Sequence, residues 1–281
     1  MFDLFRNKTL QVEITTACNL DCAICLRRRL KRPNRFLSFD GFKRILRQAL
    51  FPYVGLHGWG EPLLNPHIFE MVHYARAKGV ITNLTTNGTL IRDRMEEIFG
   101  SGLKEIAFGV YDIDLLSSIL PDIEDFVGEK KKRGLQDPKI YFDITIYQKN
   151  RDQIPTLTRL ASDIGIDAVI LHRLFNLYGI DSQAKCLSVE DEKDLFKEIK
   201  KIARSLNIEL YLPKKHSCPC LIVKRSIFVT VDGKVTPCTY LPEEHIGDAF
   251  QESVKNIVKS SRYRDFVRKM RHHPICSKCR W

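Results

Sequence analysis

The chain has 281 residues, enough for one large domain or for a domain of about 200 residues with a small appendage. Its hydrophobic content of 44% is that of a globular protein, and its longest apolar runs fall far short of the roughly 20 residues that a membrane span needs, which excludes a transmembrane protein. The formal net charge of +11 is concentrated after residue 212, but without a recognisable base-stacking module it does not lead us to expect a nucleic-acid partner.

Between residues 10 and 212, short runs rich in β-branched residues alternate with longer amphipathic stretches. Strands are predicted at 11–15, 53–57, 80–86, 104–110, 139–147 and 167–172. Helices are predicted at 38–50, 66–79, 90–100, 113–133, 151–164 and 188–206. Ser188, with Asp191 three residues later, resembles a capping box for the last helix. Strict alternation of this kind predicts an α/β fold with a parallel sheet, either an incomplete barrel or a doubly wound sheet.

In either fold, ligands bind at the carboxyl ends of the strands, where loops and helix N-termini converge. The loops predicted at that edge are the cysteine loop after the first strand, HGWGEP at 57–62, TTNGT at 85–89, YDID at 111–114 and HRLFN at 172–176. We therefore expect the functional site among these loops.

The pattern changes after residue 212. The segment SIFVTVDGKVTPC, 226–238, predicts a hairpin that turns at Asp232 and Gly233. Two short helices at 250–259 and 262–270 follow, and then the sequence CSKCRW. This α+β segment has too little core to be stable alone, so we expect it to need a metal.

The chain has nine cysteines, and we expect metal sites among them in place of disulfides. The first residues lack the order of charged, apolar and small residues that marks a signal peptide, which predicts a cytoplasmic protein in a reducing compartment where disulfides are rare. Cys18, Cys22 and Cys25 lie close together, and a structural zinc site would need a fourth ligand that is not near them in the sequence. Three thiolates on a cubane [4Fe–4S] cluster leave one iron open to another ligand, which is typical of a catalytic cluster.

The segment CNLDCAIC at 18–25 resembles the CxxxCxxC motif of the radical S-adenosylmethionine (radical SAM) superfamily, and HGWGEPLLNP at 57–66 resembles its GGEP-type motif. The resemblance implies a partial (βα)6 barrel of the TIM type, with a [4Fe–4S] cluster in the loop after the first strand. It also implies that S-adenosylmethionine chelates the open iron, that one electron cleaves it to a 5′-deoxyadenosyl radical, and that this radical abstracts hydrogen from a substrate. The residues implied to lie around the cofactor are Gly58, Gly60, Glu61, Asn87 and Ile24.

Two positions depart from the family pattern. Ile24 precedes the third cysteine, where relatives often have an aromatic residue, so stacking on adenine is reduced to aliphatic packing. Gly109 lies on the fourth strand, where many relatives have a serine that faces the ribose. Neither change touches the three cluster ligands.

The tail resembles the Twitch domain, the shortened form of the SPASM appendage, which carries one auxiliary [4Fe–4S] cluster. The resemblance rests on four cysteines, Cys220, Cys238, Cys276 and Cys279. Cys218 competes with Cys220 for the first place, and an all-cysteine zinc ribbon is the alternative for all four. A full SPASM domain continues past the last CxxC with further cysteines, so we expect a single auxiliary cluster and two clusters per chain. The predicted domains are a radical SAM core at 1–212 and an auxiliary cluster domain at 213–281.

Six basic residues follow the third cysteine, at positions 27, 28, 29, 31, 32 and 35. Positive charge beside a cluster favours its reduction and complements an acidic electron donor such as ferredoxin or flavodoxin. We therefore expect a donor of this kind to dock on this strip or on the basic tail. The other interpretations of the strip are a contact with an anionic substrate and an ordinary solvated loop.

Polar residues near the predicted strand ends are the candidates for handling the substrate, namely Tyr111, Asp112, Tyr147, His172 and Arg173. Since strand 1 begins about ten residues into the chain, no peptide-recognition domain is expected before the barrel. This favours a small molecule or the maturation of a cofactor over modification of a ribosomal peptide or a protein residue. The alternative outside catalysis is an iron–sulfur or zinc-binding protein that keeps the barrel but has lost catalysis.

Overall fold

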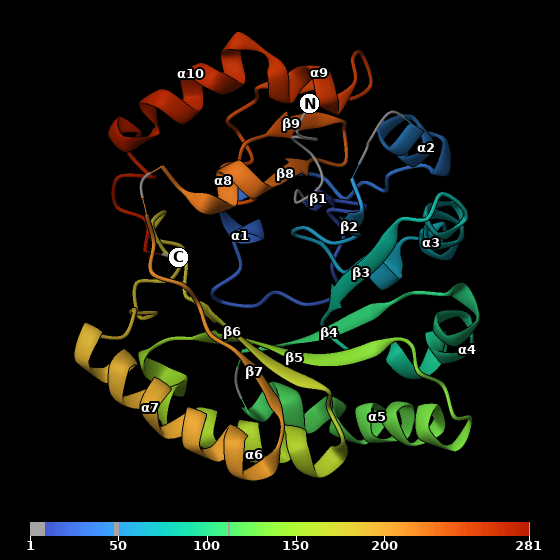
Figure 1. Ribbon diagram of the computed structural model, residues 1–281, viewed down its shortest axis with the longest axis vertical. Coiled ribbons are helices and arrows are strands. Elements are labelled where there is room, and N and C mark those ends of the chain that lie inside the picture. The colour runs from blue at the N-terminus through green and yellow to red at the C-terminus, as the bar shows by residue number, and fades with distance from the viewer. Residues whose placement is uncertain (1–8, 48–50, 112, 218, 281) are drawn as a thin grey trace. The chain divides into compact units, whose positions relative to one another are not determined.

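The computed structural model describes residues 9–47, 51–111, 113–217 and 219–280, in which strands alternate with helices (Figure 1). None of the helices in these ranges is both long enough and apolar enough to cross a membrane. The described residues pack into two compact units. The first comprises residues up to Leu84, Ser101–Leu103 and His216–Cys279, and the second comprises Thr85–Gly100, Lys104–Lys215 and Arg280.

In the first unit, strand β1 (Thr9–Val12) pairs in parallel with β2 (Tyr53–Gly55) on one side and with β8 (Ser226–Val229) on the other. Strand β3 (Ile81–Thr86) pairs with β2, while β9 (Lys234–Thr236) pairs antiparallel with β8 and with β10 (Gly247–Asp248). The helices of this unit are α1 (Arg27–Leu30), α2 (Phe39–Arg47), α3 (Ile68–Ala77), α8 (Leu221–Arg225), α9 (Val254–Lys259) and α10 (Ser261–Lys269), with 3-10 turns η1 (Pro62–Leu64) and η3 (Met270–His272).

The tail hairpin thus extends the sheet that begins with β1. Ile227, Phe228 and Val229 of β8 are at most 1% exposed. Because a short hairpin cannot bury such residues alone, their burial depends on packing with the N-terminal strands. The tail residues after 212 thus share a hydrophobic core with the N-terminal strands. This agrees with the expectation that the tail has too little core to be stable alone.

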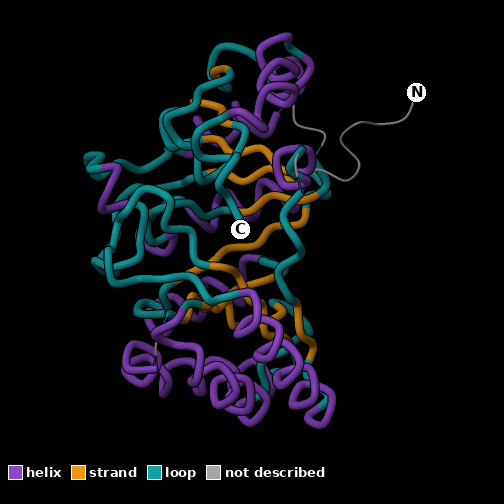
Figure 2. The backbone as a smooth tube through the Cα atoms, turned by 90° about the vertical axis from the view of Figure 1, so that its left-hand side faces the viewer, coloured by secondary structure: helices purple, strands orange, loops and turns teal. Residues whose placement is uncertain are grey.

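In the second unit, β4 (Glu105–Val110), β5 (Lys139–Ile146), β6 (Ala168–Arg173) and β7 (Glu209–Tyr211) are parallel neighbours in that order. The helices are α4 (Ile91–Ser101), α5 (Ile113–Lys132), α6 (Ile154–Ile164) and α7 (Val189–Leu206), with the 3-10 turn η2 (Gln148–Gln153). Helices α5, α6 and α7 lie along one face of these strands, as the labels of Figure 1 and the purple and orange layers at the bottom of Figure 2 show.

Burial alternates along β5. Ile140, Phe142, Ile144 and Ile146 are at most 2% exposed, whereas the residues between them are half-buried. Successive side chains of a strand point to opposite faces, so Tyr141, Asp143 and Thr145 share the other face. The strand therefore presents a polar face opposite the apolar one.

Each predicted strand and helix corresponds to an element of the structure, most with ends within three residues. The Ser188 cap is confirmed, since its hydroxyl accepts the amide of Asp191 at 3.0 Å. The hairpin turn is confirmed as well: Gly233 has φ +80°, and an added Cβ would lie 2.6 Å from the ring of Phe250. Strands β7 and β10 and helices α1 and α8 were not predicted. The predicted boundary at residue 212 between the radical SAM core and the auxiliary cluster domain stays a prediction. It was placed where the sequence motifs change, whereas the two compact units are defined by contacts.

Candidate active site

Two buried threonines close the base of the loop that carries the first three cysteines. Thr15 Oγ1 donates to the carbonyl of Arg35 at 2.8 Å, and the amide of Arg35 donates to Thr16 Oγ1 at 2.8 Å. Thr16 Oγ1 in turn donates to the carbonyl of Pro33 at 2.7 Å. Both threonines are 2% exposed, so water does not compete for these bonds, and they hold the two ends of the loop together.

Inside the loop, the backbone turns tightly around half-buried cysteines. The amide of Cys25 donates to the carbonyl of Cys22 at 3.0 Å, and the amide of Leu20 donates to the Cys18 sulfur at 3.4 Å. Burial raises the pKa of the Cys25 thiol, the nearby Cys18 adds to the rise, and the amide and charge of Arg27 oppose it. Cys18 is therefore close enough to Cys25 to contribute to the raised pKa of the Cys25 thiol, as a second ligand of one centre would be.

The segment 58–61 packs on the start of this loop. The amide of Glu61 donates to the carbonyl of Ala17 at 2.8 Å. A Cβ added to Gly60 would lie 2.4 Å from the carbonyl oxygen of Thr15 and 2.6 Å from that of Ala17. Because backbone atoms cannot yield to such contacts, only glycine allows the two segments to approach this closely.

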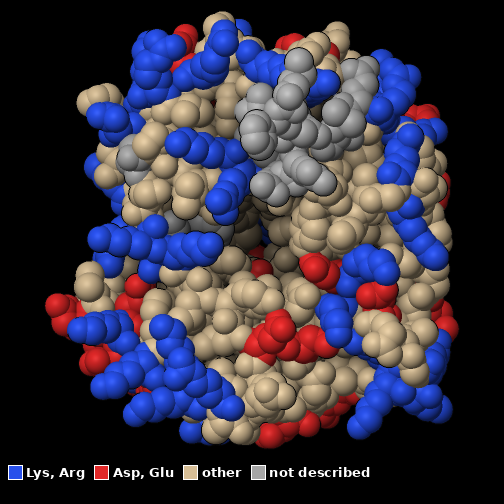
Figure 3. All heavy atoms as spheres, in the orientation of Figure 1, with Lys and Arg blue, Asp and Glu red and all other residues tan. Residues whose placement is uncertain are grey.

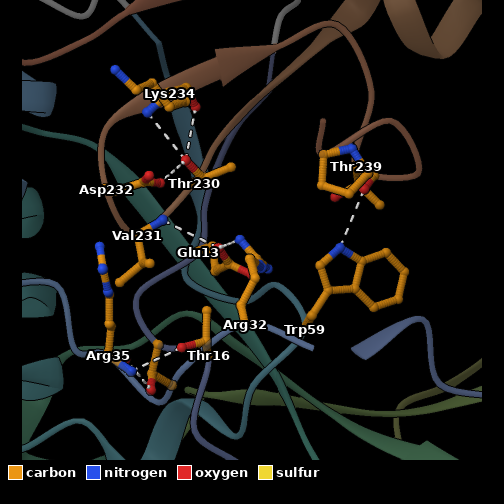
Figure 4. Close-up of polar contacts among 12 residues, drawn as sticks. Glu13, Thr16, Arg32, Arg35, Trp59, Thr230, Val231, Asp232, Lys234 and Thr239 are labelled. Carbon is orange, nitrogen blue, oxygen red and sulfur yellow. Dashed lines mark hydrogen bonds and ion pairs between the residues drawn. The ribbon is translucent and has the colours of Figure 1, made fainter. Parts of the chain in front are cut away.

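Glu13, directly after β1, is a buried charge that these segments share. Its carboxylate is 0% exposed and accepts hydrogen bonds from Arg32 at 2.5 and 2.8 Å and from the amide of Val231 at 3.1 Å (Figure 4). Gly58 lies against it, since a Cβ there would be 2.7 Å from the Cβ of Glu13. Burial raises the pKa of Glu13, and the bonds from Arg32 and Val231 oppose that rise. One side chain thus joins β1, the cysteine loop, the 58–61 segment and the tail hairpin.

Arg32 differs from the other basic residues of the strip. Its guanidinium is bound to the buried carboxylate of Glu13, so its charge is paired inside the protein. Arg27 and Arg28 lie 3.9 and 3.6 Å from Asp21, and Arg28 and Arg29 are exposed. Fewer basic residues are therefore exposed in this strip than the sequence suggests. The sequence alone does not show that Glu13, 19 residues before Arg32, is its partner.

A second connection to the tail begins at Trp59. Its indole Nε1 donates to the carbonyl of Thr239 at 3.2 Å (Figure 4), and its ring centroid is 5.5 Å from that of Tyr240. The hydroxyl of Thr239 donates to Gln11 Oε1 at 3.2 Å, and Gln11 Nε2 donates to the carbonyl of His57 at 3.2 Å. The segment that contains Trp59 is thus held on the residues that directly follow Cys238.

The tail cysteines gather around Cys238. Burial raises the pKa of Cys238 to about 12, and the neighbouring thiols of Cys220, Cys279 and Cys276 add to the rise, while the amide of Tyr240 opposes it. All four cysteines are half-buried. Cys218, the competitor for the first place, lies outside the described residues. The structure therefore brings together the four thiols that the spacing singled out.

In the second unit, the polar face of β5 carries a carboxylate that the sequence analysis missed. His172 Nε2 on β6 lies 3.2 Å from Oδ1 of Asp143. Burial raises the pKa of Asp143, and the charge of His172 opposes the rise. The signal was present in the sequence as a lone acidic residue in the apolar run KIYFDITIY, but it was not used.

The other predicted substrate residues have structural partners or lie elsewhere. The carbonyl of Tyr111 accepts from Asn150 Nδ2 at 3.0 Å, and Tyr147 is only 5% exposed. Arg173 donates to both carboxylate oxygens of Glu192, at 2.6 and 2.8 Å. Asp112 lies outside the described residues. Of the five candidates, His172 is the one paired with an ionisable group on the polar face.

The residues expected around the cofactor lie on both units. Asn87 is 9% exposed, and its Oδ1 accepts from the amide and hydroxyl of Thr89 at 3.0 and 2.7 Å. Gly88 beside it has φ +80°, and an added Cβ would lie 2.7 Å from Cδ1 of Ile119. Ile24 is half-buried in the turn before Cys25. Their roles toward a cofactor stay predictions.

Comparison with known families decides what this arrangement is. The Radical SAM superfamily model matches residues 12–128, and the model of the SPASM iron-sulfur cluster-binding domain matches residues 218–280. Together the two matches cover more than half of the chain. The chain belongs to the radical SAM superfamily and carries a SPASM-type domain.

Relatives of this radical SAM protein span most of its length. It is 29% identical to the tungsten-containing aldehyde ferredoxin oxidoreductase cofactor-modifying protein of Pyrococcus furiosus, over 97% of this chain and 87% of that protein. It is 25% identical to the PqqA peptide cyclase of Gluconobacter oxydans, over 82% of this chain and 69% of the relative.

Solved structures share the fold of this radical SAM protein. Streptococcus suis SuiB bound to its precursor peptide SuiA has a TM-score of 0.78 at 17% identity, over 94% of this chain and 67% of that one. Native anSMEcpe with bound AdoMet has a TM-score of 0.71 at 13% identity, over 92% and 82% of the two chains. The predicted fold class, α/β with a partial (βα)6 barrel, is confirmed, and the cofactors of this class are [4Fe–4S] clusters and S-adenosylmethionine.

The donor sets of this radical SAM protein fit [4Fe–4S] clusters. Thiolates are the usual protein ligands of such clusters, and three of them would leave one iron open while four would close a cluster. Cys18, Cys22 and Cys25 would hold the first cluster, and Cys220, Cys238, Cys276 and Cys279 would hold the second. Four thiolates are also a donor set for zinc, so the zinc ribbon stays the alternative for the tail.

Proposed function

We propose that this protein is an enzyme that uses S-adenosylmethionine at a catalytic cluster held by Cys18, Cys22 and Cys25, with an auxiliary cluster held by Cys220, Cys238, Cys276 and Cys279. The observation that carries the proposal is the three-cysteine loop, pinned at its base by Thr15 and Thr16 and packed against the 58–61 segment. When bound, the cluster and S-adenosylmethionine supply a one-electron cleavage of the sulfonium and a radical that removes hydrogen from a substrate carbon.

The backbone of 58–61 positions the methionine end of S-adenosylmethionine in this proposal. Gly60 lets this segment approach the carbonyls of Thr15 and Ala17, and the amide of Glu61 fixes it there. The Glu61 side chain, 2% exposed, accepts the amide of Leu63 at 3.0 Å, which holds its carboxylate at the start of η1. A rigid, preformed turn of this kind lowers the entropic cost of ordering a ligand.

The pair Asp143–His172 is proposed to accept a proton from the substrate. Removing hydrogen from a carbon that bears a hydroxyl or amine makes that group more acidic, so an oxidation needs a nearby base. Asp143 lies on the polar face of β5, and His172 orients it, with its Nε2 3.2 Å from Oδ1 of Asp143. The auxiliary cluster, when present, supplies a one-electron acceptor or a binding site for the substrate.

Asp143→Asn is expected to keep or raise stability at pH 7. Burial raises the pKa of Asp143, so its stabilising contribution is full below the unfolded pKa of about 4 and is lost as the pH rises through the folded pKa. Asn carries no charge at any pH, so the variant does not lose stability as the pH rises. The denaturation midpoints of the variant and the wild type are therefore expected to be most similar near pH 4 and to differ most at pH 7. Denaturant titrations from pH 4 to 8 measure this difference.

Asp167→Asn is the matched control for that prediction. Asp167 accepts the amide of Ile140 at 2.8 Å and pairs with Lys139 at 3.2 Å, so its loss is expected to destabilise the protein at pH 7. A fall in stability for Asp143→Asn as large as that for Asp167→Asn would make Asp143 a structural residue and remove it from the proposed chemistry.

For the substrate class, we favour a cofactor or other small molecule. The match to the cofactor-modifying protein of Pyrococcus furiosus over 97% of this chain supports this choice. A ribosomal peptide is the second candidate, because PqqA peptide cyclase and SuiB act on or bind peptides by name. Small-molecule and peptide fractions of a cell extract, each added to the reduced enzyme, distinguish the two by which one accelerates formation of 5′-deoxyadenosine.

The electron donor is proposed to be an acidic protein such as ferredoxin or flavodoxin. Lys and Arg side chains gather over α9 and α10 at the top of Figure 3, and residues 253–273 contain seven of them against one acidic residue. Arg28 and Arg29 add exposed charge beside the first three cysteines. Charge complementarity of this kind accelerates docking.

Arg28→Glu with Arg29→Glu is expected to slow reduction by a reduced flavodoxin at least severalfold, with a loss of salt dependence, because steering by the strip is reversed. Reduction by dithionite is expected to stay unchanged. The matched control is Arg264→Glu with Arg268→Glu on α10, which tests the tail as the docking surface. Equal slowing with both reductants would exclude docking at the strip.

Reductive cleavage tests the enzyme proposal itself. Anaerobically reconstituted protein with dithionite and S-adenosylmethionine is expected to form 5′-deoxyadenosine. A sample with full iron content that forms none would favour the non-catalytic alternative.

A further inference from the structure

We propose that Trp59 couples S-adenosylmethionine binding to the auxiliary cluster, so that each strengthens the other. The inference rests on the proposed function, in which the 58–61 segment contacts S-adenosylmethionine and Cys238 is an auxiliary ligand. Trp59 lies inside the first of these segments, and its indole donates to the carbonyl of Thr239, the residue after Cys238, at 3.2 Å. Trp59 is thus a positioning residue between the two centres.

The connection is made at several points. The Trp59 ring contacts Tyr240, with 5.5 Å between ring centroids. The amide of Tyr240 is the one that faces the Cys238 thiol. On the other side, Gln11 receives the Thr239 hydroxyl and donates to the carbonyl of His57, both at 3.2 Å. Any displacement of 238–240 therefore moves the Thr239 carbonyl that accepts from Trp59 and the Thr239 hydroxyl that holds Gln11, the donor to His57.

The coupling follows from the order of these segments. An auxiliary cluster fixes Cys238 and therefore the backbone at 239 and 240. With those residues fixed, the Trp59 indole keeps its hydrogen bond to the Thr239 carbonyl, and the 58–61 turn stays in its binding conformation. Less conformational entropy is then lost when S-adenosylmethionine binds. Without the cluster, the acceptor and the aromatic contact weaken. By linkage, S-adenosylmethionine must stabilise the auxiliary site by the same factor.

The experiment measures S-adenosylmethionine affinity with and without the auxiliary cluster. Anaerobic equilibrium dialysis with S-adenosylmethionine compares the full chain with Cys276→Ala/Cys279→Ala, each with and without Trp59→Phe. We expect loss of the auxiliary cluster to weaken binding about three- to tenfold, the range of one neutral hydrogen bond. Trp59→Phe alone is expected to weaken binding similarly, and the two changes together are expected to add little.

A second readout does not depend on removing a cluster. Addition of S-adenosylmethionine to the wild type is expected to shift the reduction potential and the EPR signal of the auxiliary cluster, and this shift is expected to vanish in Trp59→Phe. Gln11→Leu, which removes the second connection, is expected to reduce it. Tyr263→Phe is the control, since it removes a 2.7 Å bond to the carbonyl of Val223 in the same tail without touching Trp59, and it is expected to keep the full shift.

Two results overturn the inference. If the auxiliary-cluster variant is folded and binds S-adenosylmethionine as tightly as the wild type, or if the EPR shift survives in Trp59→Phe, the coupling through Trp59 is wrong while the proposed function stands. Failure of the fully reconstituted wild type to bind S-adenosylmethionine at all would instead overturn the proposed function, and the inference with it.

Discussion

Cys22→Ala is expected to abolish the formation of 5′-deoxyadenosine from S-adenosylmethionine. With two thiolates left in the loop, the first cluster loses the three-point attachment that leaves one iron open, and that open iron is what the cofactor requires. The four tail cysteines are untouched, so the protein is expected to keep about four irons per chain of the original eight. Liquid chromatography of the quenched reaction and iron analysis of the same sample measure both effects.

Cys186→Ala is the matched control for this loss. Cys186 is exposed, and its thiol donates to the carbonyl of Leu174 at 3.6 Å in the second unit, away in sequence from both sets of ligands. Its replacement is expected to change neither the product nor the iron content. Full activity of Cys22→Ala, or equal loss in both variants, would contradict the assignment of the first cluster.

Glu13→Ala is expected to lower the free energy of unfolding by about 3 kcal/mol. The change leaves the guanidinium of Arg32 without its carboxylate, and breaking one side of a buried ion pair costs about 3–5 kcal/mol. The lower end applies because the side chain of Arg32 is 27% exposed and water solvates part of it. The amide of Val231 also loses its acceptor. Anaerobic denaturant titration measures the change.

Two variants sharpen that measurement. Glu13→Leu with Arg32→Met removes both charges. The double change is expected to lower the free energy of unfolding by clearly less than the sum of Glu13→Leu and Arg32→Met measured alone, as is typical of a direct pair. Arg29→Ala on the same loop is exposed and is expected to change stability by less than about 0.5 kcal/mol. Additive single changes at 13 and 32 would show that the pair does not hold the site together.

The sequence predicted those features that depend on local patterns. The spacing of Cys18, Cys22 and Cys25 and the resemblance of 57–66 pointed to the superfamily, because a cluster loop needs its ligands at fixed separations. The Asp232–Gly233 turn and the Ser188 cap are likewise local, since glycine and serine meet conformational and hydrogen-bonding needs within a few residues. These elements are present where they were expected.

Features that depend on distant partners were not predictable. Glu13 looked like part of a strand and Arg32 like part of a surface strip, because only the fold brings the two carboxylate oxygens to the guanidinium. The pairing of Asp143 with His172 needs the register between β5 and β6. The parallel pairing of β8 with β1, which ties the tail to the N-terminal strands, joins segments more than 200 residues apart.

Metal analysis tests whether seven cysteines of this protein hold two [4Fe–4S] clusters. Iron, acid-labile sulfide and zinc are measured on the same anaerobically reconstituted sample of the full chain. Two [4Fe–4S] clusters give about eight irons and eight sulfides per chain with no stoichiometric zinc, and this is the expected result. About four irons with one zinc per chain would contradict it, because the tail would then be a zinc ribbon.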